Sequence, residues 1–186
     1  MARIKEVIDI ITKEKLYCIL NIHNDGNYLV WLFNGIESKD IYINVWTQIA
    51  NEFKDYNEYL IFESMDEVYF YDYYTFDYDY ATLINLHQAF VDTIRKSGGY
   101  NIQRLLLIAG AVDDLELTCN SNYKMPVDQS NKLAVSIHYY SPSDFVYDYY
   151  FEPYNWTNDE GITFTSVPNI FWEILWIILI YLKILN

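Results

Sequence analysis

The sequence predicts an α/β fold built on parallel strands. Short, almost continuously apolar runs alternate along the chain with segments in which apolar residues recur at helical spacing. Strands that are apolar on both faces are typical of a parallel sheet that is covered by helices. The chain has 186 residues, 52% of them apolar and 19% aromatic, so it is long enough for one folded domain and too apolar for a disordered chain.

The elements follow in order along the chain. A first helix is indicated by Ile4, Val7, Ile8 and Ile11, which recur at a spacing that gives one apolar face. We expect helices over residues 3–14, 45–53 and 83–94, strands over 16–23, 58–64, 104–110 and 132–141, and a loop over 24–40. The third helix should end at Gly98 and Gly99, because glycine readily supplies the left-handed conformation that follows a helix.

Polar residues gather where the predicted strands end. In parallel α/β folds, functional groups collect just beyond the carboxyl ends of the strands. The residues at these ends are His23, Asp66, Glu67, His138 and Tyr140, together with the loop that follows Gly110. We therefore expect one rim of the sheet to carry the functional site.

Charge and composition narrow the classes of partner. The formal charge of -14 repels phosphates, and the sequence has no basic stripe to offset it, so nucleic acid is not an expected partner. The 20 tyrosines suit polysaccharides, whose sugar rings stack on aromatic faces, although an AT-rich coding sequence would enrich tyrosine as well. The two cysteines, Cys18 and Cys119, have no metal-binding spacing, so no metal site is expected.

The C-terminal stretch differs from the rest. Residues 170–185 are almost continuously apolar, with Glu173 and Lys183 as the two charges. A helix over this stretch spans about 24 Å, which is less than the roughly 30 Å of a bilayer core. We therefore expect a second region over 164–186, an apolar helix in the core or in an oligomer contact, with attachment to a membrane as the less favoured alternative.

Three segments resemble glycoside hydrolase family 5, the cellulases and endoglucanases. "NIHND" is similar to the family's segment after its third strand, "FESMDE" to the segment after its fourth, and "HYYSP" to the segment after its sixth. The resemblance runs from about residue 4 to about residue 156 and implies a partial (β/α)8 barrel over 1–163, with about four parallel strands. It also implies that Glu67 is the general acid/base and that His23, Asp66, His138 and Tyr140 bind substrate.

Several departures from the family bear on activity. Asp66 stands where the family has asparagine, and an ionised aspartate cannot donate a hydrogen bond to the sugar. The family's nucleophilic glutamate, in a Gly-Glu-Phe-Gly context, is not found in the chain, and Glu173 in "FWEIL" is a poor substitute. The expected function is hydrolysis of β-1,4-glucan. The alternative is a carbohydrate-binding remnant that has lost catalysis.

Association with a second copy is the remaining expectation. Four strands are half of a closed barrel, and two exposed sheet edges favour oligomerisation, with the apolar tail as the contact. A second carboxylate could then come from the partner copy. Hydrolysis of this family's type implies no cofactor. The family is typically secreted, but "MARIKEVIDIITKEK" does not resemble a signal peptide, which leaves the localisation open.

Overall fold

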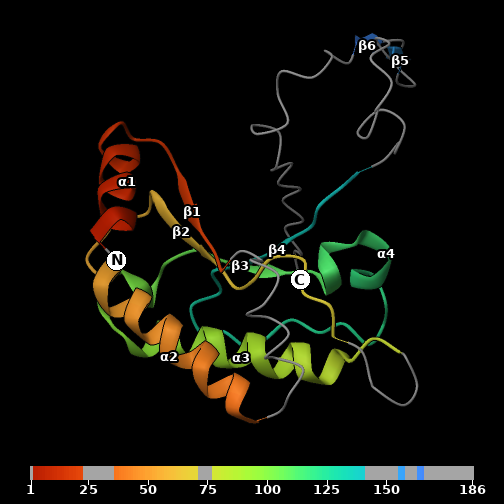
Figure 1. Ribbon diagram of the computed structural model, residues 1–186, viewed down its shortest axis with the longest axis horizontal. Helices are drawn as coiled ribbons and strands as arrows, with labels where there is room; N and C mark the ends of the chain where they lie inside the picture. The colour runs from red at the N-terminus through yellow and green to blue at the C-terminus, as the bar shows by residue number, and fades with distance from the viewer. Residues whose placement is uncertain (1, 23–35, 71–76, 141–154, 158–162, 166–186) are drawn as a thin grey trace. The chain divides into compact units, whose positions relative to one another are not determined.

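The computed structural model describes residues 2–22, 36–70, 77–140, 155–157 and 163–165. Four strands form one parallel sheet in the order β1-β2-β3-β4. They are β1 (Cys18–Leu20), β2 (Leu60–Glu63), β3 (Leu106–Ala109) and β4 (Leu133–Ser136). Neighbours in the sequence are neighbours in the sheet, so the predicted parallel α/β arrangement is confirmed (Figure 1).

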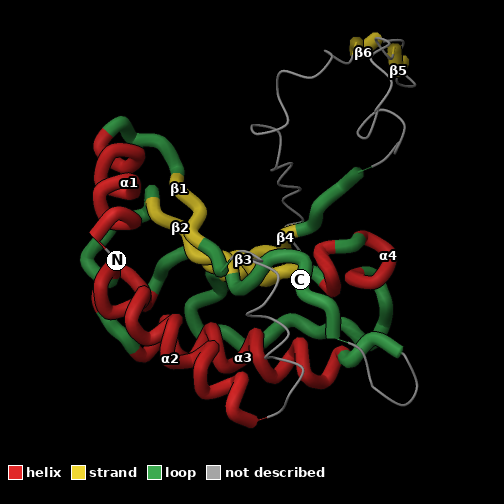
Figure 2. The backbone as a smooth tube through the Cα atoms, in the orientation of Figure 1, coloured by secondary structure: helices red, strands yellow, loops and turns green. Residues whose placement is uncertain are grey.

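The described residues contain three longer helices, one before β1, one between β1 and β2, and one between β2 and β3. They are α1 (Ala2–Lys13), α2 (Ile36–Phe53) and α3 (Tyr80–Lys96), and α2 lies beside α3 (Figure 2). All three were predicted, but α2 begins earlier than expected. The expected loop over 24–40 is therefore wrong for residues 36–40, which contain acids and a serine but continue the helix into the apolar stretch that follows. Three short helices were not predicted: η2 (Gly99–Ile102), η3 (Ala111–Asp113) and α4 (Leu115–Thr118).

The main core lies between the sheet and helices α2 and α3. Trp46 from α2 contacts Phe90 from α3 edge-on, with ring centroids 4.6 Å apart, and Phe62 from β2 at 5.7 Å. All three side chains are fully buried. Large buried aromatic rings contribute several kcal/mol each to stability, so this triad fixes how the two helices sit on the sheet.

A buried arginine organises the opposite end of the sheet from the predicted site. Arg104, just before β3, donates to the backbone carbonyls of Phe53, Tyr56, Asn57 and Leu60 and to the side chain of Asn101. It is only 3% exposed. Its guanidinium therefore joins the end of α2, the start of β2 and the segment before β3.

The two glycines after α3 behave as predicted. Gly98 and Gly99 have φ values of +79° and +59°, the left-handed region that glycine adopts without a steric penalty. A Cβ atom on Gly99 would lie 2.5 Å from the carbonyl oxygen of Lys54. The helix therefore ends where the backbone must pass close to the end of α2.

The described residues from His138 onward fall in a second unit. Within it, β5 (Asn155–Thr157) pairs antiparallel with β6 (Thr163–Thr165), a hairpin that was not predicted. Residues 166–186 lie outside the described residues, so the apolar C-terminal helix stays a prediction. Among the helices that are described, none is long and apolar enough to cross a membrane.

Candidate active site

The segment after β2 carries two of the predicted site residues. Asp66 is buried at 7% exposure, whereas Glu67 is half-buried. The backbone of Glu67 has a φ of 42°, in the left-handed region that non-glycine residues seldom adopt. The segment therefore turns sharply at Glu67, directly beyond the carboxyl end of a buried strand.

Hydrogen bonds hold the start of this segment against the neighbouring strand. The Ser64 N–H donates to the carbonyl of Leu107 at 3.0 Å, and the Ser64 hydroxyl accepts from the N–H of Ala109, also at 3.0 Å. The phenol of Tyr42 donates to the Ser64 carbonyl at 2.8 Å. Ser64 is fully buried, so the chain leaves β2 in one defined direction.

His138 and Tyr140 follow β4, as predicted. Their rings lie edge to face, with centroids 6.2 Å apart and planes at 86°. Both side chains are half-buried. His23, the fifth predicted site residue, lies outside the described residues, and its proposed contact with substrate stays a prediction.

Asp113 is a site residue that sequence reasoning missed. It lies in the loop after β3, and only that loop, not this residue, was expected at the rim. Asp113 is 1% exposed, and its carboxylate accepts hydrogen bonds from the N–H of Glu67 (2.8 Å) and of Gly110 (2.9 Å). The available signal was the acidic pair "DD", which begins four residues beyond the end of β3 and resembles the acidic pair after β2.

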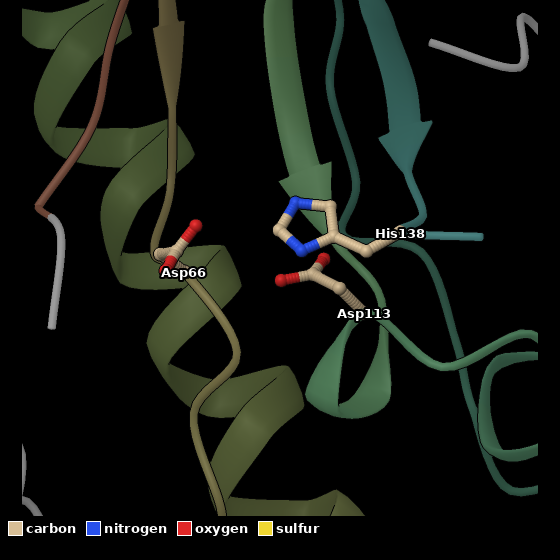
Figure 3. A group of neighbouring side chains, drawn as sticks. All are labelled: Asp66, Asp113 and His138. Atoms are coloured by element: carbon tan, nitrogen blue, oxygen red, sulfur yellow. The ribbon is translucent and has the colours of Figure 1, made fainter. Parts of the chain in front are cut away.

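Three strand ends thus meet in one group of side chains, which Figure 3 shows. One ligand atom from each of Asp66, Asp113 and His138 lies within 4.8 Å of the others. Two carboxylates and an imidazole are a donor set that could hold a first-row divalent metal ion, a possibility that the spacing of these residues in the sequence did not indicate. The same groups suit proton transfer and the binding of hydroxyls.

Two tyrosines lie close to Asp113. Tyr78 donates to the carbonyl of Val68 at 3.1 Å, and Tyr123 donates to the carbonyl of Ala109 at 3.1 Å. Burial raises the pKa of both phenols above its usual value, and the negative charge of Asp113 raises it further. Both phenols therefore remain protonated donors and help to fix the two loops.

A further buried carboxylate lies on β2 itself. Glu63 is buried at 8% exposure, and its Oε2 accepts a hydrogen bond from the side-chain amide of Asn21 at 2.9 Å. Asn21 follows β1, so this contact joins the ends of β1 and β2. Neither residue was predicted as part of the site.

Comparison with known proteins identifies the family. A model described as cellulase, glycosyl hydrolase family 5, matches residues 1–167. The chain is 38% identical over 161 residues to Endoglucanase A of Paenibacillus barcinonensis, a match that covers 77% of this chain and 40% of that protein.

Solved structures agree with this result. A GH5-4 broad specificity endoglucanase from an uncultured bovine rumen ciliate superimposes with a TM-score of 0.73 at 48% identity, covering 90% of this chain and 46% of the other. A family 5 lichenase mutant from Caldicellulosiruptor sp. F32, solved with cellotetraose, gives 0.67 at 30% identity over 77% of this chain and 43% of the other. The chain thus spans less than half the length of these relatives.

The parallel sheet, the acidic segment after β2 and the histidine after β4 occur here in a chain that the family model matches over most of its length. Its similarity to a solved endoglucanase extends over 90% of the chain. The predicted resemblance is therefore confirmed, and this chain belongs to glycosyl hydrolase family 5, the cellulase family.

Proposed function

We propose that the chain contributes the acid/base side of an active site that hydrolyses β-1,4-glucan, with Glu67 as the general acid/base. The observation that carries this proposal is the location of Glu67 directly beyond β2, next to the group formed by Asp66, Asp113 and His138. The endoglucanase and cellulase names of its relatives support the substrate class.

The proposed chemistry needs a carboxyl group that reaches the glycosidic oxygen. A general acid protonates the leaving oxygen as the bond to the anomeric carbon breaks, and the resulting carboxylate then activates water. Glu67 is half-buried, so its side chain retains access to a ligand, whereas Asp66 and Asp113 are buried beside it. This difference favours Glu67 over its two neighbours as the proton donor.

The neighbouring residues would bind the sugar. His138 and Tyr140 present an imidazole and a phenol from the end of β4, and both groups hydrogen-bond hydroxyls while their rings cover apolar sugar faces. His23 would add a third ring from the end of β1. Cellotetraose in the related lichenase structure supports a glucan chain as the ligand.

Hydrolysis also needs a second carboxylate, as nucleophile or as base. We propose that a second copy of the chain is one source, because two copies of the sheet would bring two Glu67 side chains to one mouth. A separation of about 5 to 5.5 Å between the carboxyl groups would give retention of configuration, and about 6.5 to 9.5 Å would give inversion.

The test compares Glu67→Gln with the unmodified chain on carboxymethyl cellulose and cellotetraose. Loss of an essential acid typically lowers the rate by orders of magnitude, so we expect at least about a 100-fold fall in reducing-sugar release. Glu52→Gln is the matched control, because Glu52 is an exposed glutamate on α2 and should leave the rate unchanged. Full hydrolysis by Glu67→Gln would contradict the proposal.

A second candidate function is carbohydrate binding without cleavage. Asp66 favours it, because a buried carboxylate lies where the family has an amide that donates to the sugar. The two candidates differ in whether bound sugar is cleaved. A binding remnant binds cellotetraose in calorimetry but releases no shorter sugar. In that case Glu67→Gln leaves the affinity for cellotetraose close to that of the unmodified chain.

A further inference from the structure

We propose that Asp113 is the positioning residue for Glu67: its carboxylate holds the Glu67 backbone in place across two loops. This inference rests on the proposed function of Glu67 as the acid/base. It adds a residue whose part in the site is not implied by the resemblance to the family and depends on contacts in the tertiary structure.

The two oxygens of Asp113 have different partners. Oδ1 accepts from the N–H of Gly110, three residues earlier, which is a local turn interaction within the loop after β3. Oδ2 accepts from the N–H of Glu67, 46 residues away in the sequence and on the neighbouring strand end. A purely local turn would use the first contact alone, so the second contact is what links the two loops.

Backbone conformation shows why Glu67 needs such support. Glu67, Val112 and Asp113 have φ values of 42°, 56° and 53°, all in the left-handed region. Such residues are strained, and Val112 is β-branched, which makes the conformation harder to adopt. Strained conformations persist where surrounding contacts over-determine them, and Asp113 supplies the contact at Glu67.

The surroundings make this hydrogen bond strong. Asp113 is 1% exposed, and a hydrogen bond to a carboxylate is stronger than one between neutral groups. Tyr78 joins the same two loops by donating to Val68 and by approaching the backbone of Val112. With Asp113 removed, Tyr78 still tethers Val68, but the N–H of Glu67 loses its charged partner.

The experiment compares Asp113→Ala and Asp113→Asn with Asp114→Asn. Alanine removes both acceptors, whereas asparagine keeps the shape and retains one oxygen for two N–H donors. Asp114 is the matched control, because it is the adjacent aspartate but accepts from Leu117 at 2.8 Å as the cap of α4. The measurements are amide hydrogen exchange resolved at Glu67, and kcat and KM on cellotetraose.

We expect the Glu67 amide to exchange about tenfold faster or more in Asp113→Ala, with a smaller rise in Asp113→Asn. The kcat should fall about 10- to 100-fold while KM changes less than about twofold, since misplacement of a catalytic group affects the chemical step. Asp114→Asn should change neither quantity.

Unchanged exchange at Glu67 in a folded Asp113 variant would overturn the inference, as would an equal rise at all amides, which indicates general destabilisation. If Asp113→Ala does not fold, amide exchange at Glu67 in Asp113→Asn tests the inference in the same way. The exchange measurement does not require activity. A chain in which Glu67→Gln hydrolyses normally therefore refutes the acid/base proposal, while exchange still decides whether Asp113 holds Glu67.

Discussion

Asp66 and Asp113 bring two buried carboxyl groups to within 4.8 Å of each other from the ends of adjacent strands. Like charges this close in a poorly solvated place repel each other, so the pair is tolerated only because other groups surround it. Both residues have hydrogen-bonding or electrostatic partners. A change in the charge of Asp66 should therefore also affect Asp113.

Replacement of Asp66 by asparagine should therefore increase activity. The amide removes one negative charge next to Asp113 and supplies the donor that the family uses toward the sugar. We expect kcat/KM on β-glucan to rise about tenfold, in line with one hydrogen bond gained in the transition state. Asp55→Asn, at an exposed position on the surface, is the control. A fall in kcat/KM would show that the Asp66 carboxylate itself is used.

Arg104 should be sensitive to a conservative change. Arg104→Lys keeps a positive charge but provides three donors in place of the planar fork that reaches four carbonyls and Asn101. Burial lowers the pKa of Arg104 to about 10, and the charge of Arg95 adds to this effect. We expect the free energy of unfolding, measured in urea, to fall by about 3 kcal/mol. Arg3→Lys, at an exposed position on α1, should change it by less than about 0.5 kcal/mol.

His87 should make the fold sensitive to acid. It is fully buried on α3, and neither ring nitrogen has a hydrogen-bond partner among the described residues. Burial lowers its pKa from 6.5 to about 3. Between pH 6.5 and about pH 3, His87 therefore binds a proton in the unfolded chain but not in the folded chain. The stability of the fold is retained above pH 6.5 and falls as the pH falls through this range.

His87→Leu removes this titration. Below pH 6.5, the unfolding free energy of the unmodified chain should fall about 1.4 kcal/mol per pH unit more steeply than that of the variant. Urea titrations at pH 7, 5.5 and 4.5 measure the difference. Asn85→Leu, at an exposed position on the same helix, should keep the steep dependence. Parallel curves for the unmodified chain and His87→Leu would contradict the prediction.

Oligomerisation stays a prediction, which rests on the edges of the sheet. In the described sheet, β1 and β4 are the outer strands, and each pairs with a neighbour on one side. Unpaired strand edges favour association with another chain. We expect light scattering to give a mass of at least two chains of 22.2 kDa. A monomeric mass at all micromolar protein concentrations would refute this prediction.

The parallel sheet could be predicted from periodicity because each buried strand is a short apolar run, such as "LLLIAG", between amphipathic helices. The start of α2 could not, because Glu37, Ser38 and Asp40 interrupt the apolar pattern at its first turn. The hairpin of β5 and β6 was missed for a related reason: each strand has three residues, too few to establish an alternating pattern.

The sequence by itself determined the order of the elements, the family, and the presence of Asp66, Glu67, His138 and Tyr140 beyond strand ends, because these depend on residues that are near one another in the chain. The tertiary structure decided that Asp113 meets the backbone of Glu67 and that Arg104 joins α2, β2 and β3. Such contacts join residues about 50 positions apart. They form only in the folded chain, where burial excludes water and each buried donor must be paired with an acceptor inside the protein.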